Sequence, residues 1–483
     1  MQHANCNLQR KERCHYEDSY TLPSVLTENI MHGQKRAEYK ARLANDAIAA
    51  KLSHKASQWN NLTSELLKRR DAMLDHGDEN IIESSLQVTA KLLSVNPDPN
   101  YLWNYRREIL DLQILAQKDS THEEWLKQEL IVTQTALEAN PKAYGAWFHR
   151  KWCIRKFVHK VLELGTNSAS SSCQTVLDRE LYLCAEFLTL DERNFHCWNY
   201  RRFIVGCNMD LIIFAESSTE CSTDNINDIT SVHSYMNGAW TFTRYLSDNV
   251  WKESIPTIGA QLTPTIWKEA NDGEITNVCL LSNDAQKKVY NLIQSEYQFT
   301  YDKIAQNFSN GSAFHYRTKL LPFILSFRLN FNEREISHIK FDLAREELDI
   351  IRNAIFTEPD DQTCWWYLRF IVDWSNPLKQ KQNDPQSEED DDYSVDEYKD
   401  MLYQEWLTIR ELVEAEKGRC KWGLLAMHMI AMIFLDENVG LKDTHFKGED
   451  WMDHVQTYVS QLKTLDPDRS IRYKSLLNLG RNH

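Results

Sequence analysis

The chain has 483 residues, of which 42% are hydrophobic, and it carries a formal net charge of −15. A chain of this length forms two or three ordinary domains or one extended helical array. Its negative charge argues against a general nucleic-acid binder, which needs positive charge to displace counterions from phosphates. Glycine and proline are scarce, at 14 and 11 residues, which disfavours sandwiches, propellers and glycine-rich phosphate loops and favours helices.

The sequence shows neither a membrane-spanning run nor a secretion signal. The longest nearly apolar run, residues 423–435, is well short of the roughly 20 residues that a membrane helix needs. The N-terminal residues lack the apolar stretch of a signal peptide. The 11 cysteines include no C-x-x-C pair, and Cys153, Cys184 and Cys197 lie in apolar helical stretches. We therefore expect reduced core thiols in a cytoplasmic protein.

The first segments along the chain differ in composition. Residues 1–33 are polar and are predicted to form a disordered N-terminal extension. Residues 34–75 are rich in Lys, Arg and Ala, which are good helix formers, so a long helix is predicted there. This helix opens a predicted region, residues 34–207, that also holds three copies of a repeat.

A repeated motif, an aromatic residue three positions before an arginine, defines the architecture. It occurs four times, as Trp103/Arg106, Trp147/Arg150, Trp198/Arg201 and Phe314/Arg317. A fifth copy has Trp365 in register and its Arg369 one position late, and a sixth copy, around Lys421 and Trp422, is degenerate. The five aromatic residues follow one another at intervals of 44, 51, 116 and 51 residues. These intervals indicate a long helical repeat with one large insertion.

Each copy is predicted to be two helices joined by a turn. An apolar stripe such as Ile82, Leu86, Ala90 and Leu93 precedes the motif with helical spacing. An Asn-Pro, Asp-Glu or Glu-Pro pair then breaks the helix, and the motif starts a second one. One hairpin cannot bury both of its faces, so the sequence predicts an all-α fold, a right-handed α-α superhelix of stacked hairpins. We interpret the Trp/Arg pairs as its framework, with Trp buried and Arg bonded to a carboxylate or to helix-end carbonyls.

Composition divides the rest of the chain. Residues 208–284 are rich in Ser, Thr and Asn and are predicted to be an insertion, and residues 285–372 hold the fourth and fifth repeats. Residues 373–397 form an acidic linker, which we expect to be solvated. Residues 398–483 return to helical periodicity as degenerate C-terminal repeats.

No familiar catalytic motif occurs in the sequence. It contains no G-x-x-x-x-G-K-[ST] phosphate loop, no G-x-G-x-x-G fingerprint, no H-E-x-x-H and no G-x-S-x-G. His and Cys never fall at zinc-finger spacing. The residues alone therefore leave a helical scaffold without chemistry of its own as an open interpretation.

The repeats resemble those of the protein prenyltransferase α subunit family, whose signature is P-x-x-Y-x-x-W-x-x-R in a helical hairpin. Residues 142–150, KAYGAWFHR, and residues 194–202, NFHCWNYRR, carry this resemblance. The segments NPDPNYLWNYRREIL and NFSNGSAFHYR resemble the type II branch of the family, Rab geranylgeranyltransferase. The sequence departs from animal members in having no immunoglobulin-like insert after the fifth repeat and no leucine-rich repeats. These departures put in doubt the partner contacts that such domains make.

This resemblance implies the α subunit of a heterodimeric enzyme that is inactive without its β subunit. Such an enzyme transfers a geranylgeranyl group from geranylgeranyl diphosphate to C-terminal cysteines of Rab GTPases, which a Rab escort protein presents. Zinc and the lipid pocket belong to the β subunit, so the resemblance implies no metal site in this chain.

The resemblance also implies roles for individual residues. By their positions in the motif, Lys142, Tyr144 and His196 would stabilise the diphosphate that leaves during transfer. Their ordinary alternatives are a solvated turn lysine, a structural tyrosine and a packed or interface histidine. His32 lies in a Met-His-Gly segment that resembles the family's usual N-terminus, and it would make a regulatory contact with the partner's zinc.

Two other functions stay open. One is the α subunit shared by farnesyltransferase and type I geranylgeranyltransferase, which differs in its partner and substrate. The other is a non-catalytic helical-repeat adaptor of tetratricopeptide type. The repeat length disfavours the adaptor, because tetratricopeptide units recur about every 34 residues and lack the Trp/Arg pair.

Overall fold

The computed structural model describes residues 46–76, 79–116, 122–164, 167–220, 283–330, 336–377, 391–436 and 444–476. Within these residues every regular element is a helix, so the predicted all-α, helical-repeat class is confirmed. None of these helices is both long and apolar enough to cross a membrane. The predicted extension, residues 1–33 with His32, lies outside the described residues.

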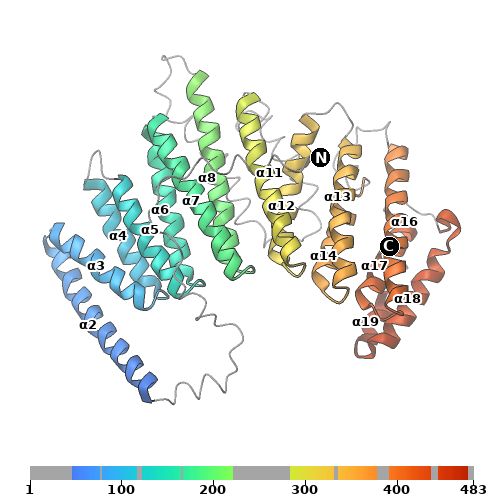
Figure 1. Cartoon of the computed structure of the whole chain (residues 1–483), viewed down its shortest axis with the longest axis horizontal. Helices are drawn as coiled ribbons and strands as arrows, with labels where there is room; N and C mark the ends of the chain where they lie inside the picture. The colour runs from blue at the N-terminus through green and yellow to red at the C-terminus, as the bar shows by residue number, and fades with distance from the viewer. Residues whose placement is uncertain are drawn as a thin grey trace, which may run out of the picture. The chain divides into compact units, whose positions relative to one another are not determined.

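Two compact units make up the chain, Met1–Phe157 and Val158–His483, and each is described by itself. The first contains α2 (Asp46–His76), α3 (Glu79–Val95), α4 (Asn100–Ala116), α5 (His122–Ala139) and most of α6 (Tyr144–Leu164). Helix α2 packs against α3, and α3 packs against α4 and α5. Figure 1 shows α2 in blue. This helix is the described part of the one predicted over residues 34–75.

The second unit is a series of helical hairpins followed by a short C-terminal group of helices (Figure 1). The hairpins are α7 (Asn167–Leu190) with α8 (Phe195–Glu220), α11 (Asn283–Gln306) with α12 (Gly311–Asn330), α13 (Ile336–Thr357) with α14 (Gln362–Trp374), and α16 (Asp391–Ala415) with α17 (Lys421–Leu435). The C-terminal group is η4 (Phe446–Gly448), α18 (Trp451–Leu465), η5 (Pro467–Arg469) and α19 (Ser470–Leu476).

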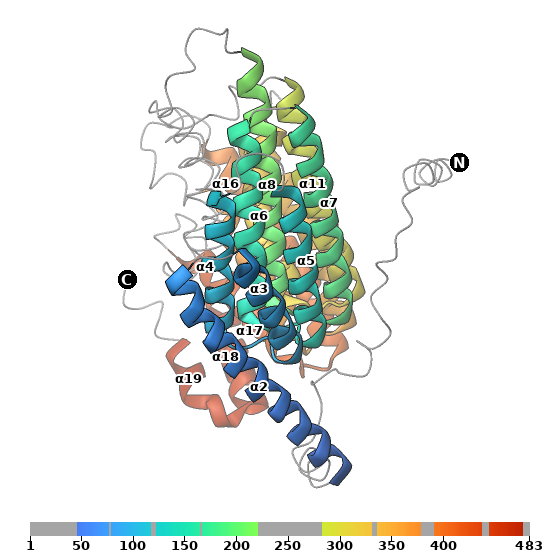
Figure 2. The ribbon, with the colours of Figure 1, turned by 90° about the vertical axis from the view of Figure 1, so that its left-hand side faces the viewer.

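Each hairpin of the second unit has a first and a second helix. First helices pack against first helices of neighbouring hairpins, and second helices pack against second helices. Among the second helices, α12 contacts α14 and α14 contacts α17, while α13 contacts α16 among the first helices. Figure 2 shows α7 and α11 together on one side of α8. We call the surface formed by α8, α12, α14 and α17 the second-helix face.

Two helices extend past the boundaries expected from composition. Helix α8 continues to Glu220, so residues 208–220 of the predicted insertion are helical, and residues 221–282 lie outside the described residues. Helix α16 begins at Asp391, inside the predicted acidic linker. Met209 and Leu211 are buried on the extension of α8. Helix α8 therefore continues through the apolar residues 211–215, at the start of a segment that is polar overall.

The motif tryptophans tie each second helix to the turn before it. Trp103, Trp147, Trp198 and Trp365 are buried. Each indole Nε1–H donates to a carbonyl oxygen six residues earlier, at 2.8 to 2.9 Å, those of Pro97, Pro141, Glu192 and Pro359. A large apolar ring is thus buried with its single polar group satisfied. Phe314, which has no N–H, occupies this position in the fourth repeat and is also buried.

The cysteines of the described residues belong to this core. Cys153, Cys184 and Cys197 are buried and free, as expected from their apolar surroundings. Burial raises the pKa of Cys153 and of Cys197 well above the ordinary thiol value. These side chains therefore act as small hydrophobic groups in the packing.

Candidate functional site

The turn between α5 and α6 holds Lys142 in a defined position. The Asn140 side chain accepts the Lys142 backbone N–H at 3.0 Å and donates to Asp98 Oδ1, in the preceding repeat, at 2.9 Å. The Lys142 side chain is exposed. Helix α6 begins two residues later, at Tyr144, and the N-terminus of a helix carries partial positive charge. The turn therefore presents a cation beside a site that favours anions.

Tyr144 lies on the same turn as Lys142. The residue is 59% exposed, and its ring stacks on that of Phe148, with centroids 6.2 Å apart. The next residue, Gly145, is packed so closely that a Cβ there would lie 2.4 Å from Trp103 Cδ1. Helix α4 is therefore in direct contact with the start of α6, and this contact fixes the backbone that carries Tyr144.

His196 occupies the equivalent turn of the third repeat, in the second unit. It is the second residue of α8. Its backbone N–H donates to Asn194 Oδ1 at 3.1 Å, and its partly exposed ring lies 3.9 Å from the Phe195 ring, between centroids. The structure thus places Lys142 and Tyr144 together in one turn, and His196 belongs to the other unit.

The motif arginine of the first repeat connects its own hairpin to the next one. Arg106 on α4 donates from Nε and Nη2 to the Glu129 carboxylate on α5, at 2.7 and 2.6 Å. Its Nη1 donates to the Leu86 carbonyl and to Thr89 Oγ1 on α3. One side chain therefore joins three helices through charge-assisted bonds.

Arg150, the motif arginine of the second repeat, bonds in the same way to the first helix of its own hairpin. It is buried, and its Nη1 donates to the Leu130 carbonyl and to Thr133 Oγ1 on α5, both at 2.7 Å. The carbonyl that Arg150 reaches, that of Leu130, lies in the middle of α5 and not at its end. A carbonyl oxygen has two lone pairs, so one inside a helix can accept a guanidinium N–H beside its helical bond.

The second unit repeats the arrangement of Arg106. Arg201 and Arg317 form the same two-pronged bonds to Glu296 and Glu347, respectively, with distances between 2.6 and 2.8 Å. Their Nη1 atoms donate to carbonyls of their own first helices. The glutamates were not recognised in the sequence, although they form a regular signal. Each lies 20 residues before a tyrosine or histidine that also bonds to it, as in Tyr316 with Glu296 and Tyr367 with Glu347.

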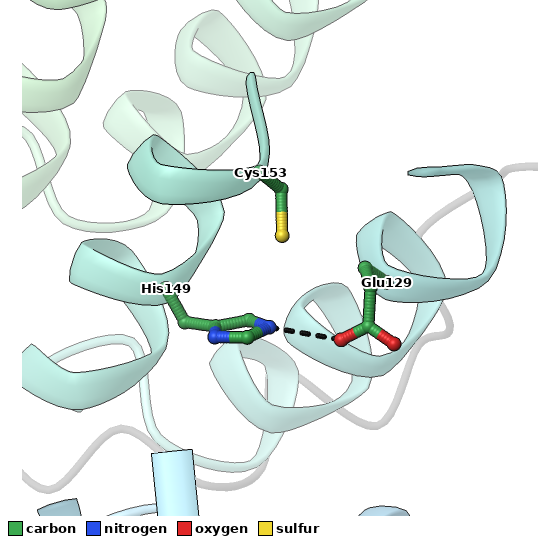
Figure 3. Close-up of side chains that lie close together, drawn as sticks. All are labelled: Glu129, His149 and Cys153. Atoms are coloured by element: carbon green, nitrogen blue, oxygen red, sulfur yellow. Dashed lines mark hydrogen bonds and ion pairs between the residues drawn. The ribbon is translucent and has the colours of Figure 1, made fainter. Parts of the chain in front are cut away.

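His149 takes the place of that tyrosine in the second repeat, and it brings together the group that most resembles a metal site (Figure 3). Its Nε2 lies 2.8 Å from Glu129 Oε2. Ligand atoms of Glu129, His149 and Cys153 all lie within 4.8 Å of one another, and all three side chains are buried. Within the residues that the structure describes, this is the candidate group for a metal ion.

The chemistry of this group does not fit a metal ion. Both carboxylate oxygens of Glu129 already accept bonds from Arg106. Burial opposes ionisation of Glu129, yet Arg106 and His149 outweigh it and lower its pKa to about 2. Burial also raises the pKa of the Cys153 thiol well above its ordinary value, which disfavours the thiolate that a metal needs. We therefore interpret the group as part of the framework between repeats.

The framework changes at the fifth repeat. Leu368 stands where the earlier repeats have arginine, and Arg369 is exposed. The glutamate of the following hairpin, Glu405, is 1% exposed and bonds through Oε2 to Arg352 at 2.9 Å, while Oε1 has no partner. Burial raises the pKa of Glu405, although Arg352 opposes this.

Comparison with known proteins agrees with this framework. Five segments match the family described as protein prenyltransferase alpha subunit repeat, namely residues 82–113, 126–157, 177–207, 293–324 and 344–375. Each segment contains one hairpin with its motif aromatic residue. The fold and these matches define a protein built from prenyltransferase-type hairpin repeats.

Several curated proteins are similar over most of the chain. Geranylgeranyl transferase type-2 subunit alpha of Homo sapiens is 27% identical over 348 residues, 72% of this chain and 42% of the relative. Proteins of the same name from Candida albicans and Saccharomyces cerevisiae are 25% and 24% identical, over 92% of this chain and 96% and 99% of their own lengths. The chain thus spans about two fifths of the length of the mammalian relative. Five hairpins of the chain are thus repeats of the protein prenyltransferase α subunit type.

Proposed function

We propose that the chain is the α subunit of a heterodimeric type II geranylgeranyltransferase. This enzyme would transfer a geranylgeranyl group from geranylgeranyl diphosphate to C-terminal cysteines of Rab GTPases. Its proposed partners are a prenyltransferase β subunit and a Rab escort protein that presents the substrate. The five repeats and the names of the relatives support this assignment.

The observation that carries the proposal is the exposed Lys142 beside the start of α6. Prenyl transfer breaks the bond between C1 of the isoprenoid and the diphosphate, so negative charge grows on the leaving group. Fixed positive charge and donors aimed at that group stabilise the transition state. We assign this role to Lys142 and to the Tyr144 hydroxyl, with His196 contributing from the third repeat.

Zinc and the lipid pocket are assigned to the β subunit. Bound there, the metal would lower the pKa of the substrate thiol and so supply the attacking thiolate. The Glu129 group of this chain is not assigned a metal, because Arg106 already engages the carboxylate. The contribution of the described residues is therefore to hold the diphosphate and to support the partner subunit.

The test is the Lys142→Ala variant, purified with the β subunit. We expect the heterodimer to assemble normally, because the side chain is exposed, and single-turnover transfer to slow by roughly 10²-fold, as when one donor to a developing anion is removed. Lys91→Ala, which changes an exposed lysine on α3, serves as the control and should transfer at the wild-type rate. An unchanged rate for the Lys142 variant would remove the assigned role.

The same preparation separates the alternative functions. We expect no transfer from this chain alone and transfer to a Rab presented by its escort protein when the β subunit is present. Transfer to a peptide with a C-terminal CaaX box instead would identify the α subunit shared by farnesyltransferase and type I geranylgeranyltransferase. A chain that binds no β subunit would be a non-catalytic adaptor.

A further inference from the structure

Three basic side chains gather on the second-helix face without an acidic partner. Arg202 lies on α8, and His315 and Lys319 lie one turn apart on α12. We call these residues the basic cluster. Lys319 is only 4% exposed. Among the described residues, no carboxylate lies within ion-pair distance of any of the three, and Lys319 makes no hydrogen bond.

Arg202 is bonded very differently from its neighbour Arg201. The Arg201 guanidinium is held by both oxygens of Glu296. The Arg202 Nε atom is buried without a hydrogen-bond partner, and Nη2 reaches only Asn199 Oδ1, at 3.4 Å. A buried donor left unbonded is unfavourable. The guanidinium of Arg202 lies over the Tyr316 ring, 5.8 Å from its centroid, so Arg202 contacts the fold but lacks the counter-charge that Arg201 has.

The charges of the basic cluster act on one another. Burial and the nearby Arg202 lower the pKa of Lys319 to about 8. Burial, Arg202 and Lys319 lower the pKa of His315 to about 3. Two positive groups, Arg202 and Lys319, have thus been brought together beside a neutral His315 and partly removed from water. A negative group placed among them would gain both charge pairing and hydrogen bonds.

The surroundings of the cluster indicate what kind of anion it receives. His315 also lines an open groove of about 1850 Å³, which is formed by residues of the second helices α12, α14 and α17 and of the C-terminal helices α18 and α19. Its apolar lining includes Trp366, Trp422 and Met429 from α14 and α17, and Arg369 lies among them. A continuous groove of this size that mixes aromatic residues, methionine and arginine is typical of a protein interface. A free phosphate ion would use the charges and leave the apolar surface uncovered.

We propose that the basic cluster receives a carboxylate side chain of the partner subunit, which lies along the second-helix face with its apolar surface in the adjoining groove. This inference rests on the proposed function, since that function supplies the partner. The carboxylate pairs with Lys319 and with the Arg202 guanidinium. The partner subunit therefore contributes one acidic residue that is surrounded by apolar surface.

The test measures chain stability and partner affinity together. In Lys319→Glu, the new carboxylate can pair with Arg202 within the chain, so we expect the free chain to melt at a higher temperature. The same variant repels the partner's carboxylate, and the dissociation constant for the β subunit should rise by at least about 30-fold, as for loss of a buried charge pair. Lys319→Met removes the charge without adding another, and it should weaken binding and lessen its dependence on salt.

Lys340→Met is the matched control. Lys340 is also buried, at 3% exposed, its Nζ has no hydrogen-bond partner, and it lies on α13, a first helix. We expect this variant to bind the β subunit with an affinity within twofold of wild type. An acidic-to-lysine change in the partner that restores binding to Lys319→Glu would identify the recognised carboxylate.

Other results would overturn the inference. If wild type binds the β subunit and Lys319→Glu binds equally well, the inference fails and the proposed function stands. If inorganic phosphate raises the melting temperature of wild type and not of Lys319→Met, with partner affinity unchanged in both, the cluster is a small-anion site and the inference fails. If wild type does not bind the β subunit, the proposed function fails first.

Discussion

At the scale of single residues, two equivalent glutamates have opposite environments. Glu347 accepts hydrogen bonds from Arg317, Tyr367 and Tyr297. Glu405 lies in the corresponding place of the next hairpin and has Arg352 alone, with one oxygen unbonded. The difference arises because Leu368 replaces the arginine that would have completed the set. The hydrogen bonds to Glu347 compensate the free-energy cost of burying its charge. For Glu405 that cost is compensated only in part, by Arg352.

This difference predicts contrasting effects of the same substitution. Glu347→Gln should destabilise the chain by about 3–5 kcal/mol, because it leaves the Arg317 guanidinium buried without a counter-charge. Glu405→Gln should be neutral or stabilising near pH 7, since it removes a carboxylate whose pKa burial has raised. Urea denaturation of both variants provides the comparison. Equal losses of stability would show that Glu405 is as well compensated as Glu347.

Two glycines near helix starts form a second matched pair. Gly145→Ala should destabilise the chain by about 1–3 kcal/mol, because the new methyl group would lie 2.4 Å from Trp103 Cδ1. Gly311→Ala should be neutral or slightly stabilising, because the nearest atom, Thr363 Cγ2, is 3.6 Å away. Melting temperatures measure both. Tolerance of Gly145→Ala would mean that α4 and α6 separate easily, and Lys142 would then be less firmly placed than we infer.

At the scale of the helical element, the sequence predicts the hairpins and misses part of what joins them. Trp103 and Arg106 could be found because their spacing recurs within one short motif. Glu129 could not be found that way, because it lies on a different helix, where periodicity shows only an apolar stripe. Its regular position, 20 residues before His149, becomes visible once the repeats are aligned over both helices. The end of α8 was not predicted because the polar composition of residues 208–284 as a whole hides the short apolar run 211–215 near their start.

In the candidate site, too, the sequence predicts some features and misses others. The positions of Lys142, Tyr144 and His196 follow from the motif that the chain shares with prenyltransferase α subunit repeats. The side-chain bonds of Asn140 and Asn194 that shape both turns were not expected. The basic cluster could not be predicted, because Arg202 and Lys319 are distant in sequence and meet only when α8 and α12 pack in one unit. A long insertion between repeats hides such contacts from any search for local spacing.

At the scale of the whole molecule, bonds between repeats couple stability to pH. The pKa of Glu129 falls from the ordinary 4.5 to about 2 because Arg106 and His149 outweigh burial. A carboxyl group whose pKa is lower in the folded than in the unfolded state stabilises the fold, and this contribution is fully present at pH values above the unfolded-state pKa. That contribution is lost as the pH falls from about 4.5 to about 2, and it amounts to roughly 3 kcal/mol.

The prediction concerns the difference in stability between wild type and Glu129→Gln. Wild type should be more stable near pH 7, and the gap should narrow steadily below about pH 4.5. Urea denaturation at a series of pH values measures it. Glu124→Gln, an exposed change on the same helix, should follow the wild-type curve. A gap that stays constant with pH would show that the Glu129 carboxylate is not specifically stabilised by Arg106.

The series of arginine–glutamate bonds between repeats is limited at both ends by changes in sequence. In the first repeat, Ser85 stands 20 residues before Tyr105, where later repeats have glutamate. In the fifth, Leu368 stands in place of arginine. Between them, Arg201 and Arg317 make the same bonds to Glu296 and Glu347. Excising one whole hairpin in register, from just after Arg201 to just after Arg317, would present Glu347 to Arg201 in place of Glu296. The inner repeats therefore present equivalent bonding groups to their neighbours. A deletion a few residues out of register would leave a buried guanidinium without its carboxylate.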